Sequence, residues 1–457
     1  MMPRQVDLDA VRSKLSVWLQ KKMPQARNLT LGAIERSGAG FTNESFLFDL
    51  SWEEEGKERS AGMVLRMEGR TYPVYPDPKI KKQFQILKRL EGTCVPAPKP
   101  YWFEEDESLL GTPFYIMGKI AGAVPSEFPP YHSFGICYEA SPEVRARMWW
   151  SLLEAVAELH KLDWRRLDFA FLGVPPPGTG PIDQELAYWE RYFQWTKESP
   201  DESHPTFEAA LRWLKENRYE PKRVTVCWGD ARMPNAIFSP EGRCLGLLDW
   251  DAAHLGDPES DLAFILTLDY LLGEGTGVPR LAGLPTKEET VRRYEALTGW
   301  KVEHLFYNEV LAGFTAGLTI LKVQKNLKKI GIVLPGDDPE RDNFCTRYLA
   351  HLLGLPMPGA AKVGVKRIEE VVATVQFHLT GPGGSEWYLV SDHGKVTRHE
   401  GVVADPDATV TCPADVWAAI QRGEINRFHA WTSGALTITG DNALVQQLEE
   451  AIAKMGA

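Results

Sequence analysis

Three oxygen-bearing side chains lie close together in the middle of the sequence and could support chemistry. Asp230 and Asn235 belong to the segment GDARMPN, and Asp249 follows in LLDWDAAHLGDPESDLA. Phosphoryl transfer needs a carboxylate that orients or deprotonates the attacking hydroxyl, together with oxygen ligands that hold magnesium on the phosphates. Asp230 suits the first role, whereas Asn235 and Asp249 suit the second. The residue types therefore predict a magnesium-dependent phosphoryl-transfer site.

The same pattern is also typical of structure without chemistry. Asp and Asn are frequent at turns and helix N-caps, so a string G-D-x-x-x-x-N taken alone favours a turn. The joint occurrence of GDARMPN, LDWD and GDPESDL at close spacing instead favours the catalytic interpretation. Arg232 lies between the predicted base and the first magnesium ligand. It could neutralise an anionic substrate or brace the loop.

A hairpin must bring these side chains together. Two strand-like runs, AIF and CLGLLDW, flank the turn residues SPEG, so Asp230 and Asn235 precede one strand and Asp249 closes the other. We therefore expect all three side chains at one rim of the hairpin.

The sequence pattern divides the chain around this hairpin into five segments. Residues 1–29 predict an amphipathic N-terminal helix, and residues 30–120 alternate β-like runs with turns around one helical stretch, KIKKQFQILKRL. Long helical patterns dominate residues 121–355. Residues 356–365 are rich in Pro, Gly and Ala, as a linker is, and residues 366–457 predict a small α+β domain.

The composition narrows the class of protein. Of the 457 residues, 44% are apolar and 25% charged, which is typical of a soluble globular protein of two or three domains. No stretch approaches the roughly 18 apolar residues of a membrane span. The net charge of -11 argues against a nucleic-acid partner, because such proteins gather Lys and Arg. The six cysteines form no CxxC pair, which predicts reduced thiols in a cytoplasmic protein.

The segment around Asp230 resembles the aminoglycoside phosphotransferase and choline kinase superfamily, and the likeness extends over residues 30–350. The chain is most similar to the branch fused to acyl-CoA dehydrogenases, through GTPFYIMGKIAG, LHKLDW, GDARMPN, LLDWDAAHLGDPESDLA and RYEALTGW. This resemblance implies a bilobal, protein-kinase-like fold, with an N-lobe at 30–120, a helical C-lobe at 121–355 and ATP between them.

The resemblance also implies roles for single residues. Asp230 matches the catalytic aspartate, Asn235 and Asp249 match the magnesium ligands, and Asp261 matches a buried aspartate that braces the catalytic loop. The nucleotide contacts that it implies are Gly38 and Gly40 in a phosphate-covering turn, Arg66 on a strand, and Met117 and Gly118 at the adenine hinge. His160 matches a histidine kept for packing.

Three positions depart from the family pattern. Arg66 replaces the usual phosphate-pairing lysine, Gln83 replaces the glutamate that would orient it, and Trp228 replaces a histidine. Two functions therefore stay open. One is an ATP- and magnesium-dependent phosphotransferase acting on a hydroxyl of a small, hydrophobic molecule; the other is a degenerate kinase-like scaffold. The aromatic stretch AYWERYFQW, residues 187–195, is either core or part of an acceptor site.

Residues 366–455 resemble the sterol carrier protein type 2 family. The likeness rests on VQFHLTGPGGSEWYLVSDHGKVTRHEG, DPDATVTCPADVWAAIQRGEIN and HAWTSGALTITGDNALVQQLEEAI. It implies a five-stranded sheet with helices over one face, around an apolar cavity for a lipid or acyl ligand. A solid core serving as a docking module fits the same apolar alternation.

Overall fold

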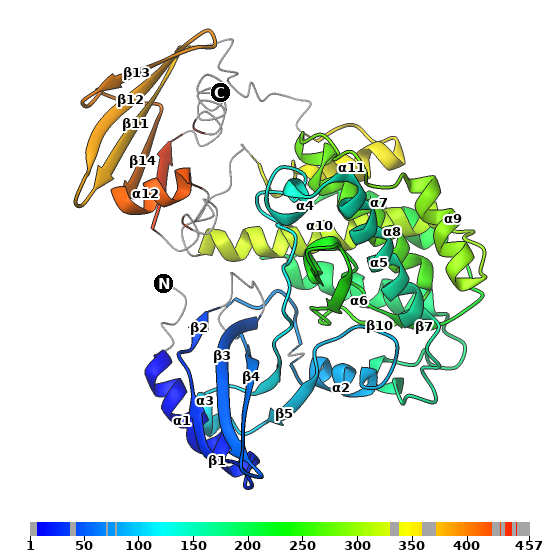
Figure 1. The fold of residues 1–457 in the computed structure, drawn as a ribbon. Helices are drawn as coiled ribbons and strands as arrows, with labels where there is room; N and C mark the ends of the chain where they lie inside the picture. Colours follow the sequence, from blue (N-terminus) through cyan, green and yellow to red (C-terminus); the bar gives the residue numbers. More distant parts are fainter. Residues whose placement is uncertain are drawn as a thin grey trace. The chain divides into compact units, whose positions relative to one another are not determined.

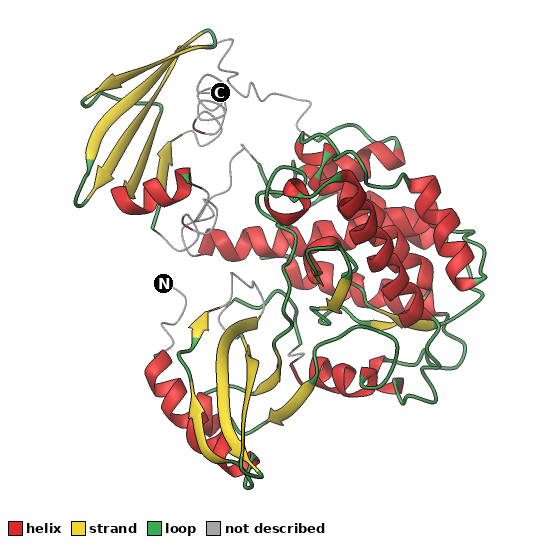
Figure 2. Ribbon diagram, in the orientation of Figure 1, coloured by secondary structure: helices red, strands yellow, loops and turns green. Residues whose placement is uncertain are grey.

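The computed structural model describes residues 7–36, 43–69, 72–77, 80–329, 338–358 and 372–422, together with 430, 435–440 and 445. The chain forms two compact units. The first comprises Met1–Asn326 and Phe344–Leu355, and the second comprises Leu327–Asn343 and Pro356–Ala457. Helices and strands are mixed in both units, which confirms the predicted α+β class (Figures 1 and 2). None of the helices in the described ranges is long and apolar enough to cross a membrane.

The first unit begins with a sheet that carries a helix against each face. Its strands are β1 (Arg27–Leu31), β2 (Glu35–Arg36), β3 (Asn43–Glu54), β4 (Lys57–Glu68), β5 (Pro100–Glu104) and β6 (Phe114–Gly118). The order is β1-β3-β4-β6-β5, with β2 paired to β3, and every pair is antiparallel. Strand β1 ends at Leu31 and β2 begins at Glu35, so residues 32–34 separate the two strands.

Alternation along β4 decides which helix each side chain meets. Leu65 belongs to the apolar cluster under α1 (Leu8–Lys22), whose buried residues include Leu15 and Trp18. Val64 belongs instead to the cluster that contains α2 (Ile80–Leu90). Since successive side chains of a strand point to opposite faces, Arg66 shares the α2 face.

The rest of the first unit is mainly helical. Its helices are α4 (Gly135–Glu139), α5 (Pro142–His160), α6 (Pro181–Thr196), α7 (Pro205–Glu216), α8 (Pro258–Leu272), α9 (Lys287–Thr298), α10 (Leu305–Lys329) and α11 (Phe344–Leu353), while α3 (Glu107–Leu110) lies between β5 and β6. Four short strands complete it as two pairs, β7 (Thr225–Cys227) with β10 (His254–Gly256) and β8 (Ala236–Phe238) with β9 (Cys244–Leu247).

Two apolar clusters hold these elements in place. One packs α5 and α8 against the short strands around the fully buried Trp149, Trp228 and Trp250. The other joins α6, α7, α10 and α11, and it contains Trp189, Tyr192 and Phe193 of the aromatic stretch. These three side chains therefore serve the core, which favours the packing interpretation of that stretch.

The second unit contains the predicted five-stranded sheet. Its strands are β11 (Val372–Thr380), β12 (Ser385–Asp392), β13 (Lys395–Glu400), β14 (Ala408–Pro413) and β15 (Thr437–Gly440), in the order β13-β12-β11-β14-β15. Helix α12 (Ala414–Gln421) brings Trp417 against Phe377, which stacks on Trp387 at 3.9 Å between ring centroids. Residues 359–365 of the predicted linker lie outside the described residues.

Candidate active site

The loop between β7 and β8 brings Asp230 and Asn235 into contact. The Asn235 amide Nδ2 donates to Asp230 Oδ2 at 2.7 Å and to the Asp230 carbonyl oxygen at 3.0 Å. Strands β8 and β9 pair antiparallel, with Ala236 opposite Leu247, so the predicted hairpin is confirmed. The Leu248 amide also donates to the Asn235 carbonyl at 2.8 Å, which places the residue before Asp249 against the same loop.

Asp249 follows the hairpin in a left-handed backbone conformation, with φ of 55°. Burial raises the pKa of the Asp230 carboxyl, and the nearby Asp249 charge adds to this effect, while Arg232 and Asn235 oppose it. The Asp230 and Asp249 carboxylates repel each other, and a cation bound between them would reduce this repulsion.

Arg232 holds the other oxygen of Asp230. Its Nε donates to Asp230 Oδ1 at 2.8 Å, and its Nη1 forms an ion pair with Glu127. Both carboxylate oxygens of Asp230 therefore accept a hydrogen bond from its own loop. Of the two roles left open for Arg232, these contacts correspond to bracing.

Asp261 fixes the start of the loop from α8. It is fully buried and accepts from the Trp228 amide at 2.6 Å, the Gly229 amide at 2.7 Å and His160 Nε2 at 3.0 Å. His160 contacts Tyr294 through Nδ1, so the histidine is part of the packed support, as expected. Gly229 has φ of +81°, and a Cβ there would overlap the Ala252 carbonyl, so only glycine fits between the two loops.

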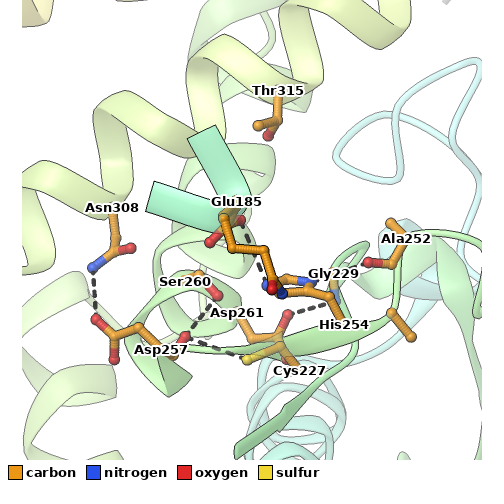
Figure 3. A network of polar contacts seen from close by, with 12 residues as sticks. Glu185, Cys227, Gly229, Ala252, His254, Asp257, Ser260, Asp261, Asn308 and Thr315 are labelled. Atoms are coloured by element: carbon orange, nitrogen blue, oxygen red, sulfur yellow. Dashed lines mark hydrogen bonds and ion pairs between the residues drawn. The ribbon is translucent and has the colours of Figure 1, made fainter. Parts of the chain in front are cut away.

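Gly229 and Asp261 also line a small cavity of about 20 Å³, together with Glu185 and His254 (Figure 3). The sequence did not indicate this cavity. Glu185 of α6 and His254 of β10 form an ion pair at 3.5 Å beside it. Burial alone would lower the pKa of His254, but the Glu185 carboxylate raises it well above its ordinary value. Because the two residues come from distant elements, no spacing in the sequence indicated the pair.

The predicted phosphate-binding residue Arg66 faces the same site from β4. Its Nη2 lies 3.3 Å from Asp249 Oδ1, and its Nη1 lies 3.5 Å from Ser45 Oγ. Its Nε is buried and has no hydrogen-bond partner among the residues that the structure describes. A buried donor of this kind calls for an acceptor, and a phosphate oxygen is the acceptor that arginine matches best.

Only two of the other four predicted nucleotide contacts lie in the described part of the chain. Met117 and Gly118 end β6, where Met117 is buried and the Gly118 amide donates to the Lys99 carbonyl at 2.8 Å. Their contact with adenine stays a prediction. Gly38 and Gly40 lie outside the described residues.

Gln83, the expected glutamate position, is buried on α2 and does not contact Arg66 through any hydrogen bond of the described chain. Its Nε2 donates to Asp251 Oδ1 at 2.5 Å, and its Oε1 accepts from Tyr115 at 3.0 Å. Asp251 lies two residues beyond Asp249 in the sequence. Its partners on the sheet and on α2 were not foreseen.

Comparison with known proteins agrees with this geometry. The model of the phosphotransferase enzyme family matches residues 37–297, and that of the SCP-2 sterol transfer family matches residues 359–453. Since the first match covers more than half of the sequence, the chain belongs to the phosphotransferase enzyme family. The second match identifies its C-terminal part as an SCP-2 domain, so both predicted resemblances are confirmed.

Curated relatives and a solved structure extend the comparison. Acyl-CoA dehydrogenase family member 11 of Mus musculus is 30% identical over 224 residues, which are 47% of this chain and 27% of that protein. Family member 10 of Mus musculus is 29% identical over 230 residues, which are 47% of this chain and 20% of that protein. The chain thus matches about a quarter or less of these relatives. A Ralstonia eutropha structure, provisionally named an aminoglycoside phosphotransferase, has a TM-score of 0.55 and 21% identity over 76% of this chain and 99% of its own, which shows the kinase-like fold.

Proposed function

We propose that this protein is a cytoplasmic, ATP- and magnesium-dependent phosphotransferase acting on a hydroxyl group of a small, hydrophobic molecule. One observation carries the proposal. The loop between β7 and β8 carries Asp230 and Asn235, and the loop after β9 carries Asp249 close to them. Arg66 faces these side chains, and its buried Nε has no hydrogen-bond partner among the described residues. The Arg66 guanidinium suits a nucleotide phosphate, and the oxygen atoms that it faces suit the metal ion bound to that phosphate.

The donor set fits magnesium. Because Asn235 commits its Nδ2 to Asp230, its Oδ1 is the atom left to face a cation, and Asp249 adds a carboxylate oxygen. Magnesium prefers such hard oxygen ligands. When bound, the metal would neutralise charge on the nucleotide phosphates. Nucleotide would lie between the proposed N-lobe at 30–120 and C-lobe at 121–355, where Met117 and Gly118 would contact the adenine.

Asp230 is the group that would act on the acceptor. Its carboxylate is oriented by Arg232 and Asn235, and it would accept the proton of the attacking hydroxyl. The Nε of Arg66 would donate a hydrogen bond to a phosphate oxygen. Asp249 would hold the Nη2 of the same guanidinium in place. Burial raises the pKa of Asp230, which makes its carboxylate a stronger base than a solvent-exposed aspartate.

Binding of Mg-ATP tests the proposal directly. At a hundred times its dissociation constant, Mg-ATP should stabilise the native protein by about 2.7 kcal/mol, which differential scanning fluorimetry would report as a higher melting temperature. Asp249→Ala should remove most of this shift, while Asp201→Ala, an exposed aspartate far from the site in sequence, should retain it. If wild-type protein shows no shift, the degenerate scaffold, which the Gln83 and Trp228 departures favour, is the better description.

The C-terminal domain is proposed to bind a lipid or acyl ligand that is related to the acceptor. Its family match supports this, together with an apolar face built from Phe377, Trp387, Leu389, Val410 and Leu436. Organic extraction of the purified full-length protein, followed by mass spectrometry, should yield a bound lipid in stoichiometric amount. Recovery of no more lipid than from a protein-free buffer control would favour a solid docking module.

A further inference from the structure

The arginine that braces Asp230 is itself held by a residue from outside the loop. Arg232 Nε donates to Asp230 Oδ1 at 2.8 Å, and the Nη1 of the same guanidinium forms an ion pair with Glu127. Glu127 precedes Arg232 by 105 residues and lies between β6 and α4. The guanidinium therefore bridges two carboxylates, only one of which belongs to the loop between β7 and β8.

This bridge is sheltered from solvent. The exposed fraction of the side chain is 15% for Arg232, 22% for Asp230 and 31% for Glu127. Burial would lower the pKa of Arg232, but the Asp230 and Glu127 carboxylates raise it above its ordinary value. A guanidinium held through one nitrogen can pivot about that hydrogen bond, whereas a second contact through another nitrogen fixes its plane. The contact with Glu127 thus determines how Arg232 presents its Nε to Asp230.

The backbone that carries Glu127 is attached to the same hairpin. Ala123 and Phe238 of β8 exchange two backbone hydrogen bonds, of 3.0 and 2.8 Å. A Cβ at Gly122 would lie 2.7 Å from the Phe238 carbonyl oxygen, so this close approach requires a glycine. Strand β8 directly follows the loop that carries Asp230. The segment that presents Glu127 is therefore fixed relative to that loop.

We infer that Glu127 is a positioning residue for phosphoryl transfer, which fixes the Arg232 guanidinium so that Arg232 in turn holds the Asp230 carboxylate. The inference rests on the proposed function, since Asp230 needs a fixed direction only if it accepts a proton. In the transfer, the acceptor oxygen bonds to the γ-phosphorus and the bond from that phosphorus to the oxygen of the departing ADP breaks. The hydroxyl proton passes to Asp230. Glu127 takes no proton and acts through Arg232 alone.

Truncation of Glu127 in the full-length protein tests this role. We expect Glu127→Ala to lower kcat roughly tenfold or more, because small displacements of a reacting group are costly. Mg-ATP affinity, measured by isothermal titration calorimetry, should stay within about threefold of wild type, since Asn235, Asp249 and Arg66 are unchanged. The rate is ADP formation, measured with water as the acceptor and with a panel of hydroxylated lipids, acyl-thioesters and sterols. A wild-type kcat in Glu127→Ala, or a loss of affinity as large as the loss of kcat, would overturn the inference.

Glu127→Gln is the conservative variant. Its amide oxygen can still accept from Arg232 Nη1, so the guanidinium keeps its second contact. We expect this variant to retain at least about a third of the wild-type kcat. Glu127→Gln as slow as Glu127→Ala would show that the hydrogen bond to Arg232 does not carry the effect, and the positioning role would be rejected.

A double-mutant cycle shows whether Glu127 acts through Arg232. Arg232→Met removes the guanidinium and keeps much of the apolar stem. In that background Glu127→Ala should change kcat by less than about twofold, because the group that transmits its effect is already absent. If the two losses of kcat multiply instead, Glu127 acts by another route and the inference fails.

The same series separates this inference from the proposed function. If wild-type protein forms no ADP with water or with any member of the panel, the proposed function fails, and the role of Glu127 fails with it. If wild-type protein forms ADP and Glu127→Ala is equally fast, only the role of Glu127 fails. Glu216→Ala serves as the matched control, because it removes an exposed carboxylate at the end of α7 and should change neither kcat nor Mg-ATP affinity.

Discussion

Asp230→Asn is expected to lower kcat for phosphoryl transfer by roughly 10²–10⁴-fold, the usual contribution of a general base. The substitution keeps the shape of the side chain but removes the group that accepts the hydroxyl proton. Mg-ATP binding should stay within about threefold of wild type, because Asn235, Asp249 and Arg66 are unchanged. The measurement is ADP formation with the acceptor that gives the highest wild-type rate in a screen of hydroxylated lipids, acyl-thioesters and sterols.

The fold of the variant must be checked separately. Both Arg232 Nε and Asn235 Nδ2 donate to Asp230, and an amide at this position can accept only through its single oxygen. A modest loss of stability is therefore expected, and the urea midpoint reports it. A large fall in kcat with a nearly unchanged midpoint and unchanged Mg-ATP affinity assigns the effect to chemistry. An Asp230→Asn enzyme as fast as wild type would rule out Asp230 as the base.

The hairpin and its three polar residues could be predicted from the sequence because they are local. Asn235 and Asp230 are five residues apart, and the turn between β8 and β9 fixes where Asp249 follows. The five-stranded sheet of the C-terminal domain could also be predicted from the sequence, since apolar alternation and glycine-bearing turns mark its strands. By contrast, β10 has only three residues, His254–Gly256, and its sequence shows no alternation.

The contacts that organise the site across the chain could not be predicted. Gln83 and Asp251 are separated by 168 residues, and Asn43 and Asp251 by 208. Nothing in either segment indicates that a neutral amide on a helix will meet a carboxylate on a distant loop. The departure at Gln83 was visible in the sequence, whereas its hydrogen bonds with Asp251 and Tyr115 became visible only in the folded chain. Local patterns thus identified which residues could react, and the tertiary structure identified which residues hold them.

Asp261→Ala is expected to lower the free energy of unfolding by about 3–5 kcal/mol, the range for removing one partner of a buried, charged hydrogen-bond network. The carboxylate is fully buried and accepts from the Trp228 and Gly229 amides and from His160. Without it, three donors lose their acceptor inside the core. Urea unfolding of the full chain measures the change, with Asp201→Ala expected to stay within about 0.5 kcal/mol of wild type.

Asp261→Asn separates the loss of acceptors from the loss of volume. It fills the same space, but its amide nitrogen must face a donor, so one of the two backbone amides is left opposed rather than bonded. The variant should therefore remain clearly less stable than wild type, and its kcat should fall further than that of a distant variant of equal stability, because Gly229 directly precedes Asp230. If Asp261→Asn unfolds at the wild-type urea concentration, the buried carboxylate does not brace the loop. The position of Asp230 must then come from Arg232 and Asn235 alone.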